Sequence, residues 1–427
     1  MSRVVRRRWE ADLGSGLPRR DHRSCTYEAY IPDLLAGRRI SLDGDVAADV
    51  ADAEAAIARL NAEAITLVDT EALARILLRA ESVASSKIEG LEVGPRRLIR
   101  AEAARLLGES SDDVTADEVL ANIDAMSWAV ETLAHEKTIT LDGLLEVHRR
   151  LLAETRLAEH AGKIRAQQNW IGGSSYNPCS ADFVPPPPEE VHDLLVDLCA
   201  FCNDDSLPAI AQAALAHAQF ETIHPFVDGN GRTGRALIHV ILRRRGLAAL
   251  VLPPISLILA TRADDYIAGL TATRHRGRVD SAAARDGLNR WVGSFAAAAN
   301  RSVTDAAAFE ARVVEIQNNW RLRVGRIRQH SAIDRLIQTL PGAPLLTVSH
   351  GSELIGRSFQ QTNEAISRLV DVGILTQVSI GRRNRAFEAS EIVDGFMDLE
   401  RKLASPTGDT RSAPPVRNVP RRRPAQR

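Results

Sequence analysis

The chain has 427 residues, too many for one compact domain, and a hydrophobic fraction of 44% is enough for sizeable cores. The formal net charge is −1, so bulk charge gives no argument for binding nucleic acid or an anionic membrane. No stretch is apolar enough to span a bilayer, and the amino terminus lacks the apolar core of a secretory signal. These features predict a cytoplasmic protein without a membrane partner.

The four cysteines are too few and too scattered for a disulfide framework in a chain of this length. Cys199 and Cys202 form a single C-x-x-C, and no second Cys/His pair completes a zinc site. The surrounding segment, EEVHDLLVDLCAFCNDD, has the spacing of an amphipathic helix. We therefore expect reduced cysteines, as a reducing cytoplasm would give.

Residues 1–25 are polar and basic, and we expect a flexible amino terminus. Residues 26–110 should form an N-terminal helical region. VAADVADAEAAIARLNAEA (46–64) and EALARILLRAESVASSKIEG (71–90) both place apolar residues at helical spacing. The second helix should end at Gly90, a residue suited to a helix C-cap.

Residues 111–325 continue as a larger helical core. Helical patterns cover 114–160, 189–245 and 283–325. Between them lies IGGSSYNPCSADFVPPPP, residues 171–188, whose paired glycines and four consecutive prolines exclude a helix interior. This segment predicts a short hairpin or extended loop over the surface of a mainly α fold.

Residues 330–400 have a different texture. They predict helix, turn, helix and then two β-runs around GRRN, the order of elements in a winged helix. The Pro/Arg/Ser-rich residues 404–427 should be disordered.

The partner of this winged helix stays open between DNA and protein. The candidate recognition helix, SFQQTNEAISRLVDVG (358–373), offers polar side chains that could grip phosphates and read bases. The wing contributes the arginines Arg382, Arg383 and Arg385. However, Glu364 and Asp371 also lie on the helix, and a basic wing can face protein.

A dense group of Gly, Asn and Arg runs from residue 228 to 235, DGNGRTGR. Gly229, Asn230 and Gly231 at a helix start offer backbone N–H groups to an anion, helped by the helix dipole. Arg232 and Arg235 are three residues apart and so share a helical face. Two guanidinium groups aimed at one anion site suit the phosphates of a nucleotide.

Two further residues in the same motif suit phosphate chemistry. Asp228 offers an oxygen ligand for Mg²⁺, and His224 has the pKa range of a general base for a hydroxyl. A single His before Pro is usually structural, and two arginines on a helix are usually solvated. Their coincidence within twelve residues favours nucleotidyl or phosphoryl transfer.

The whole motif, HPFVDGNGRTGR (224–235), resembles the Fic pattern H-P-F-x-[DE]-G-N-G-R-x-x-R at every defined position. The resemblance extends upstream through AHAQFETI (216–223) and GKIRAQQNWIGG (162–173), and covers roughly residues 25–300. It implies a mainly α, Fic-type helical core with a β-hairpin flap. Members often carry a C-terminal winged helix as well.

Fic proteins usually transfer AMP from ATP to a Ser, Thr or Tyr hydroxyl of a protein and release pyrophosphate. The resemblance therefore implies ATP and Mg²⁺ as ligands and a protein target, which can be the chain itself. It assigns His224 as base, Asp228 as Mg²⁺ ligand, Pro225 and Phe226 as structural residues, Gly229, Asn230 and Gly231 as the anion hole, and Arg232 and Arg235 as phosphate ligands.

The resemblance also identifies residues 171–188 as a flap that aligns the target backbone by strand addition. Its docking residues would be Ile171, Gly172, Gly173, Phe183 and Val184. The intact GNG argues against a Doc-like kinase, whose loop departs from this pattern.

A second short segment, SSKIEG (85–90), matches the Fic inhibitory pattern [ST]-x-x-x-E-[GN]. Ser85 and Glu89 are four residues apart, on one helical face. A carboxylate delivered to Arg235 would form an ion pair and obstruct the γ-phosphate site. The alternative is a solvated Glu89 near a helix end; beside a full Fic motif, we expect autoinhibition.

Alternative functions remain at this stage. Related glutamates can orient a water for removal of AMP, and the motif reads phosphates, so another nucleotide could be transferred. A different class is a DNA-binding regulator that uses the Fic core as a nucleotide sensor. The resemblance further implies a homodimer.

Overall fold

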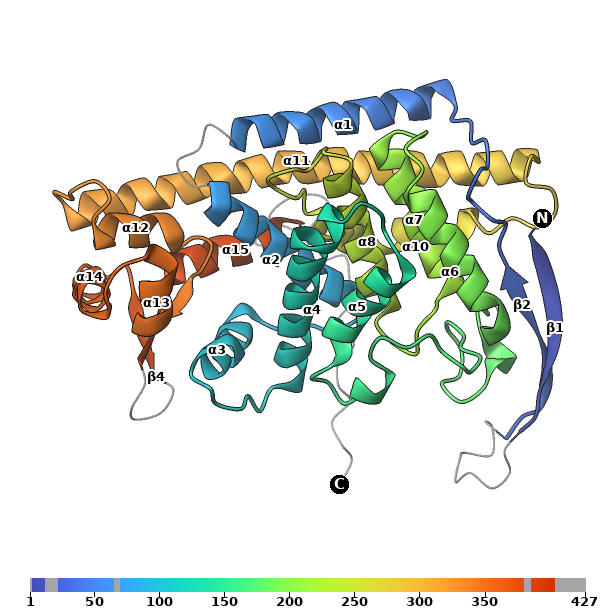
Figure 1. The fold of residues 1–427 in the computed structure, drawn as a ribbon, viewed down its shortest axis with the longest axis horizontal. Helices are drawn as coiled ribbons and strands as arrows, with labels where there is room; N and C mark the ends of the chain where they lie inside the picture. The colour runs from blue at the N-terminus through green and yellow to red at the C-terminus, as the bar shows by residue number, and fades with distance from the viewer. Residues whose placement is uncertain (1, 12–21, 65–69, 380–384, 404–427) are drawn as a thin grey trace. The chain divides into compact units, whose positions relative to one another are not determined.

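The structure, a computed structural model, describes residues 2–11, 22–64, 70–379 and 385–403 (Figure 1). The chain divides into two compact units, residues 1–306 and 307–427, and the boundary falls inside helix α11 (Ala282–Val324). We expected the helical core to run to residue 325, but the end of α11 belongs to the second unit. There, Trp320 is fully buried and its indole N–H donates to Glu391 at 3.1 Å. Within the described residues, no helix combines the length and apolarity needed to cross a membrane.

The core of the first unit is built on α7 (Ala209–Ile223) and α8 (Asn230–Arg244). Every residue of α7 is buried, because other helices surround it on all sides. The other helices of the unit are α1 (Gly44–Ala64), α2 (Thr70–Ile88), α3 (Pro95–Leu106), α4 (Val114–Glu131), α5 (Leu141–Leu152), α6 (Pro188–Cys202), α9 (Ile255–Thr261) and α10 (Ala263–Ala272), with short 3₁₀ turns at Leu133–His135, Ala158–His160 and Pro178–Ser180. The helical expectation for these regions is confirmed, and Cys199 and Cys202 are buried on α6.

Helix α2 is fixed by buried polar contacts along its length. Glu81 is fully buried and accepts from the amide of Ser256 at 2.8 Å, while His239 Nε2 lies 2.8 Å from it. One residue later, the carbonyl of Ser82 accepts from the Asn122 side chain at 2.8 Å. The helix stops where expected, since Gly90 has φ +83°, a left-handed conformation that glycine adopts without strain. These contacts set the direction in which the end of α2 points.

The basic amino terminus is not loose, and that expectation was wrong for its described part. β1 (Arg3–Trp9) pairs antiparallel with β2 (Cys25–Ile31) over seven residues. Figure 1 shows this ribbon beside α6, and Arg3 pairs with Glu190 of that helix at 2.6 Å. Trp9 packs edge-on against Trp170 at 5.4 Å. The arginine-rich sequence led us to expect a solvent-exposed, flexible segment, because the acidic residues that pair with it are remote in the chain.

A disulfide joins Cys25 to Cys179, which corrects the expectation of four reduced cysteines. The two residues are 154 positions apart, so their spacing in the sequence carried no sign of the pairing. A hydrogen bond joins the same two segments, since the amide of Tyr30 donates to the carbonyl of Val184 at 2.9 Å. The β1–β2 ribbon is thus fastened to the segment expected to be the flap.

The second unit contains α12 (Ala332–Thr339), β3 (Leu345–Thr347), α13 (Val348–Ile355), α14 (Phe359–Asp371), β4 (Thr376–Ser379), β5 (Arg385–Glu388) and α15 (Ser390–Leu403). The strands form an antiparallel sheet in the order β3-β5-β4. Gly356, at φ +59°, turns the chain between α13 and α14, and Ser358 and Gln361 form a capping box. This is the element order expected of a winged helix. Arg382, Arg383 and the tail 404–427 lie outside the described residues.

Removal of the disulfide by Cys25→Ser should lower the free energy of unfolding of the first unit by about 2–4 kcal/mol, because the cross-link closes a long loop. Amide hydrogen exchange should accelerate in β2 and in residues 171–184, which the disulfide ties together. Cys199→Ser is the matched control. Equal exchange in both variants would contradict the bracing role.

Candidate active site

The motif loop joins the end of α7 to the start of α8. His224 caps α7 with its backbone in the left-handed region, at φ +49°. For a residue with a Cβ, this conformation costs about 1–2 kcal/mol and persists only where the surroundings impose it. The His224 amide still donates to the carbonyl of Phe220 at 2.9 Å, so the chain leaves the helix abruptly. Backbone strain of this kind is concentrated at functional sites.

A pair of hydrogen bonds closes the loop on itself. Asn230 Oδ1 accepts from the amide of Phe226 at 2.8 Å, and Asn230 Nδ2 donates to the carbonyl of Phe226 at 2.9 Å. The Phe226 ring is fully buried and stacks on the ring of His148 at 3.7 Å. Gly229 starts α8 at φ +77°, where a Cβ would meet Leu151 at 2.8 Å. The side chain of Asn230 therefore shapes the loop, which leaves its backbone for an anion.

Two side chains from the segment ahead of the flap hold the loop from outside. Arg165 donates through Nε to the carbonyl of His224 at 2.9 Å, and its amide donates to the carbonyl of Pro225 at the same distance. Asn169 Nδ2 donates to the carbonyls of His224 and Phe226, both at 3.1 Å. Burial lowers the pKa of Arg165 to about 10. Sequence reasoning assigned neither residue, although both lie in the GKIRAQQNWIGG segment that carried the resemblance.

His148 on α5 supports the loop from a third side. Its Nδ1 accepts from the amide of Gly162 at 3.0 Å, so the neutral ring donates through Nε2 to the carbonyl of Asp228, also at 3.0 Å. Burial lowers the pKa of His148 to about 4, so the ring stays neutral near pH 7. Nothing in the sequence around His148 marked it.

His224 is neutral for the same reason. Burial lowers the pKa of His224 to about 4, although the carboxylate of Glu89 acts in the opposite direction. A neutral imidazole can accept a proton, which is what a general base for a hydroxyl requires.

The start of α8 concentrates positive charge. The first-turn backbone N–H groups have no partner within a helix, and Gly231 has no side chain to cover them. Arg232 is 2% exposed, and among the described residues its Nε and Nη1 atoms have no hydrogen-bond partner. Its Nη2 donates to Asp228 Oδ2 at 3.3 Å. Buried, unpartnered N–H groups on a cation are costly, and they indicate a site that an anionic ligand completes.

Arg235 lies one turn further along α8 and is 1% exposed. It donates to the hydroxyl and to the carbonyl of Ser85, both at 2.8 Å, and to Glu89 Oε1 at 2.7 Å. A Cβ added at Gly231 would overlap Glu89 Oε1, so the carboxylate lies directly on the glycine of the anion site. Burial acts to raise the pKa of Glu89, but Arg235 outweighs it, and the pKa lies below the usual value.

Asp228 points a carboxylate to solvent, with its side chain 48% exposed. Within the described ranges, no cluster of three or more His, Cys, Asp or Glu side chains could hold a metal ion on its own. Mg²⁺ is commonly bound by one or two carboxylates together with substrate phosphates. The single carboxylate beside an anion site fits that mode of binding.

Residues 171–188, the segment that we expected to form a flap, follow Asn169 in the chain. Ile171 and Phe183 form an antiparallel bridge, with N···O distances of 2.8 and 3.1 Å. Gly172 and Gly173 are exposed and adopt φ +76° and +71°. Val184 is buried, and its carbonyl already accepts from β2, so its backbone serves the fold.

Comparison with known proteins finds family models that match two stretches of the chain. Residues 138–242 match the model described as the Fic/DOC family, and residues 47–131 match the Fic/DOC family N-terminal model. These two stretches of the chain are therefore similar to the two domains of the Fic/DOC family. Glu89 and Ser85 fall within the N-terminal match, and the motif loop falls within the Fic match.

Curated relatives of the Fic part cover only a portion of each chain. "Protein adenylyltransferase fic-1" of Caenorhabditis briggsae is 36% identical over 164 residues, which are 37% of this chain and 29% of that protein. "Protein adenylyltransferase Fic" of Nematostella vectensis is 34% identical over 154 residues, 35% of this chain and 33% of that protein. The chain thus matches about a third or less of the length of these relatives.

A solved structure extends the likeness in fold. The crystal structure of a Fic family protein from Desulfovibrio desulfuricans aligns with a TM-score of 0.50 and 19% identity, covering 82% of this chain and 97% of that one. The prediction of a mainly α fold with a Fic-type core is confirmed.

The structure brings most of the sequence-predicted Fic residues together. The loop and the start of α8 hold His224, Pro225, Phe226, Asp228, Gly229, Asn230, Gly231, Arg232 and Arg235. Ser85 on α2 and Glu89 just beyond its end contact Arg235. In the segment expected to be the flap, Ile171 and Phe183 form a bridge and Gly172 and Gly173 are exposed, whereas Val184 is buried. Sequence reasoning missed Arg165, Asn169 and His148, because each acts on backbone atoms far along the chain.

The buried neutral state of His148 should make the Fic unit less stable in acid. Its pKa is about 4 when folded and about 6.5 when unfolded, so the unfolded chain binds the extra proton between these values. His148 then contributes about 3 kcal/mol above pH 6.5, and this stability is lost as the pH falls towards 4. Urea unfolding at pH 7 and pH 4.5 should show a smaller loss for His148→Gln than for wild type.

His192→Gln is the control for this pH series, because His192 is 62% exposed. Equal pH dependence in wild type and His148→Gln would contradict the assignment.

Proposed function

We propose that the chain is a protein adenylyltransferase, which moves AMP from ATP to a Ser, Thr or Tyr hydroxyl of a protein and releases pyrophosphate. One observation carries the proposal: a neutral His224 precedes a helix start at which Arg232 and Arg235 are both buried, and Nε and Nη1 of Arg232 have no hydrogen-bond partner among the described residues. The names of the matched relatives, protein adenylyltransferases, support the same activity.

In the proposed step, the hydroxyl oxygen attacks the α-phosphorus, and the bond from that phosphorus to the pyrophosphate oxygen breaks. His224 accepts the hydroxyl proton. The N–H groups at the start of α8 stabilise the negative charge that develops on the phosphates. Arg232 and Arg235 hold the leaving pyrophosphate. Asp228 would hold Mg²⁺, which supplies further neutralisation of that pyrophosphate.

Glu89 restrains this reaction in our proposal. Its carboxylate neutralises Arg235 and lies on Gly231, where distal phosphates would otherwise bind. ATP can therefore react only after Glu89 withdraws. Orientation of a water by Glu89, with removal of AMP from a modified protein, is the alternative reaction for the same residues, and another nucleotide is the alternative donor.

In this proposal, the protein substrate binds at the flap. Exposed backbone at Gly172 and Gly173 can accept an extended target strand, a mode that depends little on target sequence. The chain itself is one candidate target. We also infer a homodimer from the family likeness; sedimentation equilibrium tests it, and a monomer at all concentrations would exclude it.

The substitution Glu89→Gly should increase the rate of AMP transfer. With α-labelled ATP and Mg²⁺, label should appear on the chain or on lysate proteins for Glu89→Gly, at least about tenfold above wild type, because Arg235 is freed for phosphate. Glu89→Gly/His224→Ala should lose the label, because the base is gone.

Glu92→Gly is the matched control, since Glu92 is an exposed acid three residues beyond Glu89. Wild-type behaviour is expected for it. Absence of label in every variant, despite ATP binding, would overturn the transfer proposal and favour AMP removal or a nucleotide sensor.

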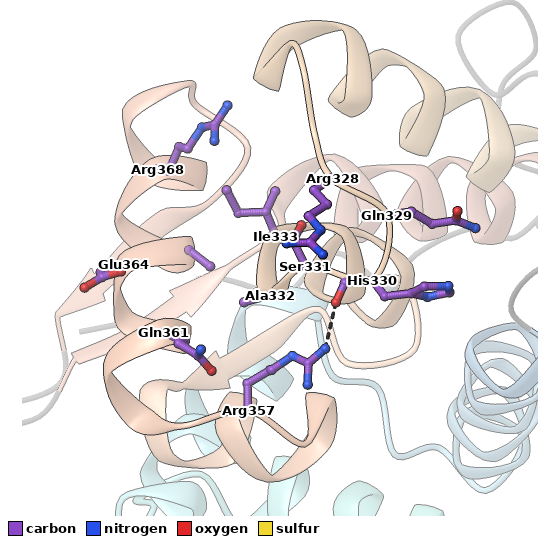
Figure 2. A pocket seen from close by; sticks show the side chains of 11 residues that line it. Arg328, Gln329, His330, Ser331, Ala332, Ile333, Arg357, Gln361, Glu364 and Arg368 are labelled. Atoms are coloured by element: carbon purple, nitrogen blue, oxygen red, sulfur yellow. Dashed lines mark hydrogen bonds between the residues drawn. The ribbon is translucent and has the colours of Figure 1, made fainter.

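The second unit supports an additional candidate function, binding of duplex DNA by a winged helix. A groove of about 730 Å³ runs between α14 and the residues that lead into α12 (Figure 2). Three arginines line it, Arg328, Arg357 and Arg368, against one acid, Glu364. Ser331, which caps the start of α12, also lines the groove.

The partners of these arginines favour an anionic ligand. Arg357 donates to the carbonyl of His330 and Arg368 to the carbonyl of Val324, at 2.8 and 3.0 Å (Figure 2 draws the first). Elsewhere in the unit, Arg312 pairs with Glu315, Arg321 with Asp334, and Arg323 with Glu391. Carbonyls position the groove arginines without cancelling their charge, and no carboxylate of the described residues pairs with Arg328.

DNA binding should therefore depend on salt through these arginines. For a duplex of roughly 30 base pairs, the slope of log K against log salt should become shallower by about 0.9 for each phosphate that an arginine no longer neutralises. We expect Arg328→Ala to weaken DNA binding. The triple variant, which adds Arg357→Ala and Arg368→Ala, should weaken it further. Arg312→Ala, which removes an ion pair outside the groove, should leave the slope unchanged.

Binding that is unaffected by the triple variant would exclude the groove. Capture of an acidic peptide in place of duplex DNA would assign the unit to a protein partner. DNA binding without any nucleotide transfer would match a regulator whose Fic core senses nucleotide.

A further inference from the structure

Glu221 is a buried acid that the proposed reaction does not yet use. It lies on α7, three residues before His224, and its side chain is 10% exposed. Its Oε1 atom is buried without a hydrogen-bond partner in the described structure. The carboxyl group lies against α8, since a Cβ added at Gly234 would come within 2.9 Å of Oε1. A buried carboxyl group without a hydrogen bond is costly, and its presence indicates a role.

The second carboxyl oxygen of Glu221 lies near the ring of His224. Glu221 Oε2 lies 3.8 Å from Nδ1 of His224, and that Nδ1 is also buried without a hydrogen bond in the described structure. Hydrogen bonds of catalytic groups are often long without substrate and shorten when it binds. A small movement would therefore satisfy both groups at once.

We propose that Glu221 is a positioning residue for His224. Its carboxylate accepts a hydrogen bond from Nδ1–H of His224, and this leaves Nε2 as the base for the target hydroxyl. When Nε2 takes the hydroxyl proton, the ring becomes an imidazolium, and the carboxylate beside Nδ1 stabilises that charge. Glu221 itself neither gains nor loses a proton in this step, as in other carboxylate–histidine pairs. This inference rests on the proposed adenylyl transfer.

Glu89 affects this pair as well as Arg235. Burial, and then the charge of Glu89, raise the pKa of Glu221 to about 7, while Arg235 and Arg274 act to lower it. The titratable and charged groups around Glu221 are Glu89 just beyond α2, His217 on α7, His224 at the end of α7, Arg235 on α8, Tyr266 on α10, and Arg274 beyond it. With Glu89 in place, Glu221 is partly protonated at neutral pH and accepts poorly. Withdrawal of Glu89 thus frees the phosphate site and also ionises the partner of the base.

The backbone carbonyl of Glu221 offers a simpler account. It faces the His224 ring and raises the pKa of His224, so it could fix the tautomer without the carboxylate. The two accounts differ in charge, because Glu221→Gln keeps the shape of the side chain and removes only its charge.

The transfer test uses the full chain in the Glu89→Gly background. Glu221→Gln should lower kcat about tenfold or more, with KM for ATP changed less than about twofold, because the imidazolium loses its counter-charge. The acid limb of the pH profile should shift as well. Glu54→Gln is the matched control, since Glu54 accepts from the amide of Ile210 at the other end of α7. Unchanged kcat and pH profile would overturn the inference.

A second readout does not depend on transfer. In protein labelled with ¹⁵N-histidine, the His224 signals are identified by their loss in His224→Ala. Glu221→Gln should lower the pKa of His224, and Glu221→Ala should mix its two neutral tautomers. If these changes occur but no variant transfers AMP, the proposed function fails and the Glu221–His224 pairing stands. If neither change occurs, the carbonyl alone positions the ring and the inference fails.

Discussion

The burial of Arg235 is the constraint on which the site depends. A guanidinium that is 1% exposed must be compensated inside the protein, because an unpaired buried charge costs several kcal/mol. Arg235 cannot give up its proton, so the surroundings must supply acceptors. Ser85 supplies a hydroxyl and a carbonyl, and Glu89 supplies the charge. Burial of Arg235 on α8 therefore requires that the end of α2 packs against α8.

This requirement couples the N-terminal helices to the chemistry of the loop. α2 is fixed by Glu81 with Ser256 and His239, and by Asn122 with Ser82, so it delivers Glu89 to one place. The Glu89 carboxylate that compensates the charge of Arg235 also obstructs the anion site. A phosphate can replace the carboxylate as the counter-charge, which makes inhibition and substrate binding competing solutions to the same electrostatic problem.

The site was predictable from sequence where its residues are close in the chain. HPFVDGNGRTGR fixes spacing along one loop and one helix start, so the neighbours of Arg232 and Asp228 follow from helical geometry. The Arg235–Glu89 contact was inferred from the family pattern, since the two residues lie far apart. Arg165, Asn169 and His148 were missed because they contact backbone atoms of a loop that is remote in the chain, and such contacts leave no periodic signal.

The fold shows the same limit. Amphipathic spacing predicted the helices, and Gly90 ended α2 as expected, because both are local effects. The ribbon of β1 and β2 was missed, since an arginine-rich strand is stabilised by acids of α6 and by a disulfide to Cys179, and these partners meet only in the folded chain.

The most direct test of the account is the affinity for Mg·ATP, measured by titration calorimetry on wild type and Glu89→Gln. The glutamine keeps the size of the side chain and removes the charge that competes with phosphate for Arg235. The account predicts at least about tenfold tighter binding by Glu89→Gln, the equivalent of one charge-assisted hydrogen bond regained by the nucleotide. Equal dissociation constants would contradict it, because Glu89 would then not compete with the phosphates of ATP for Arg235.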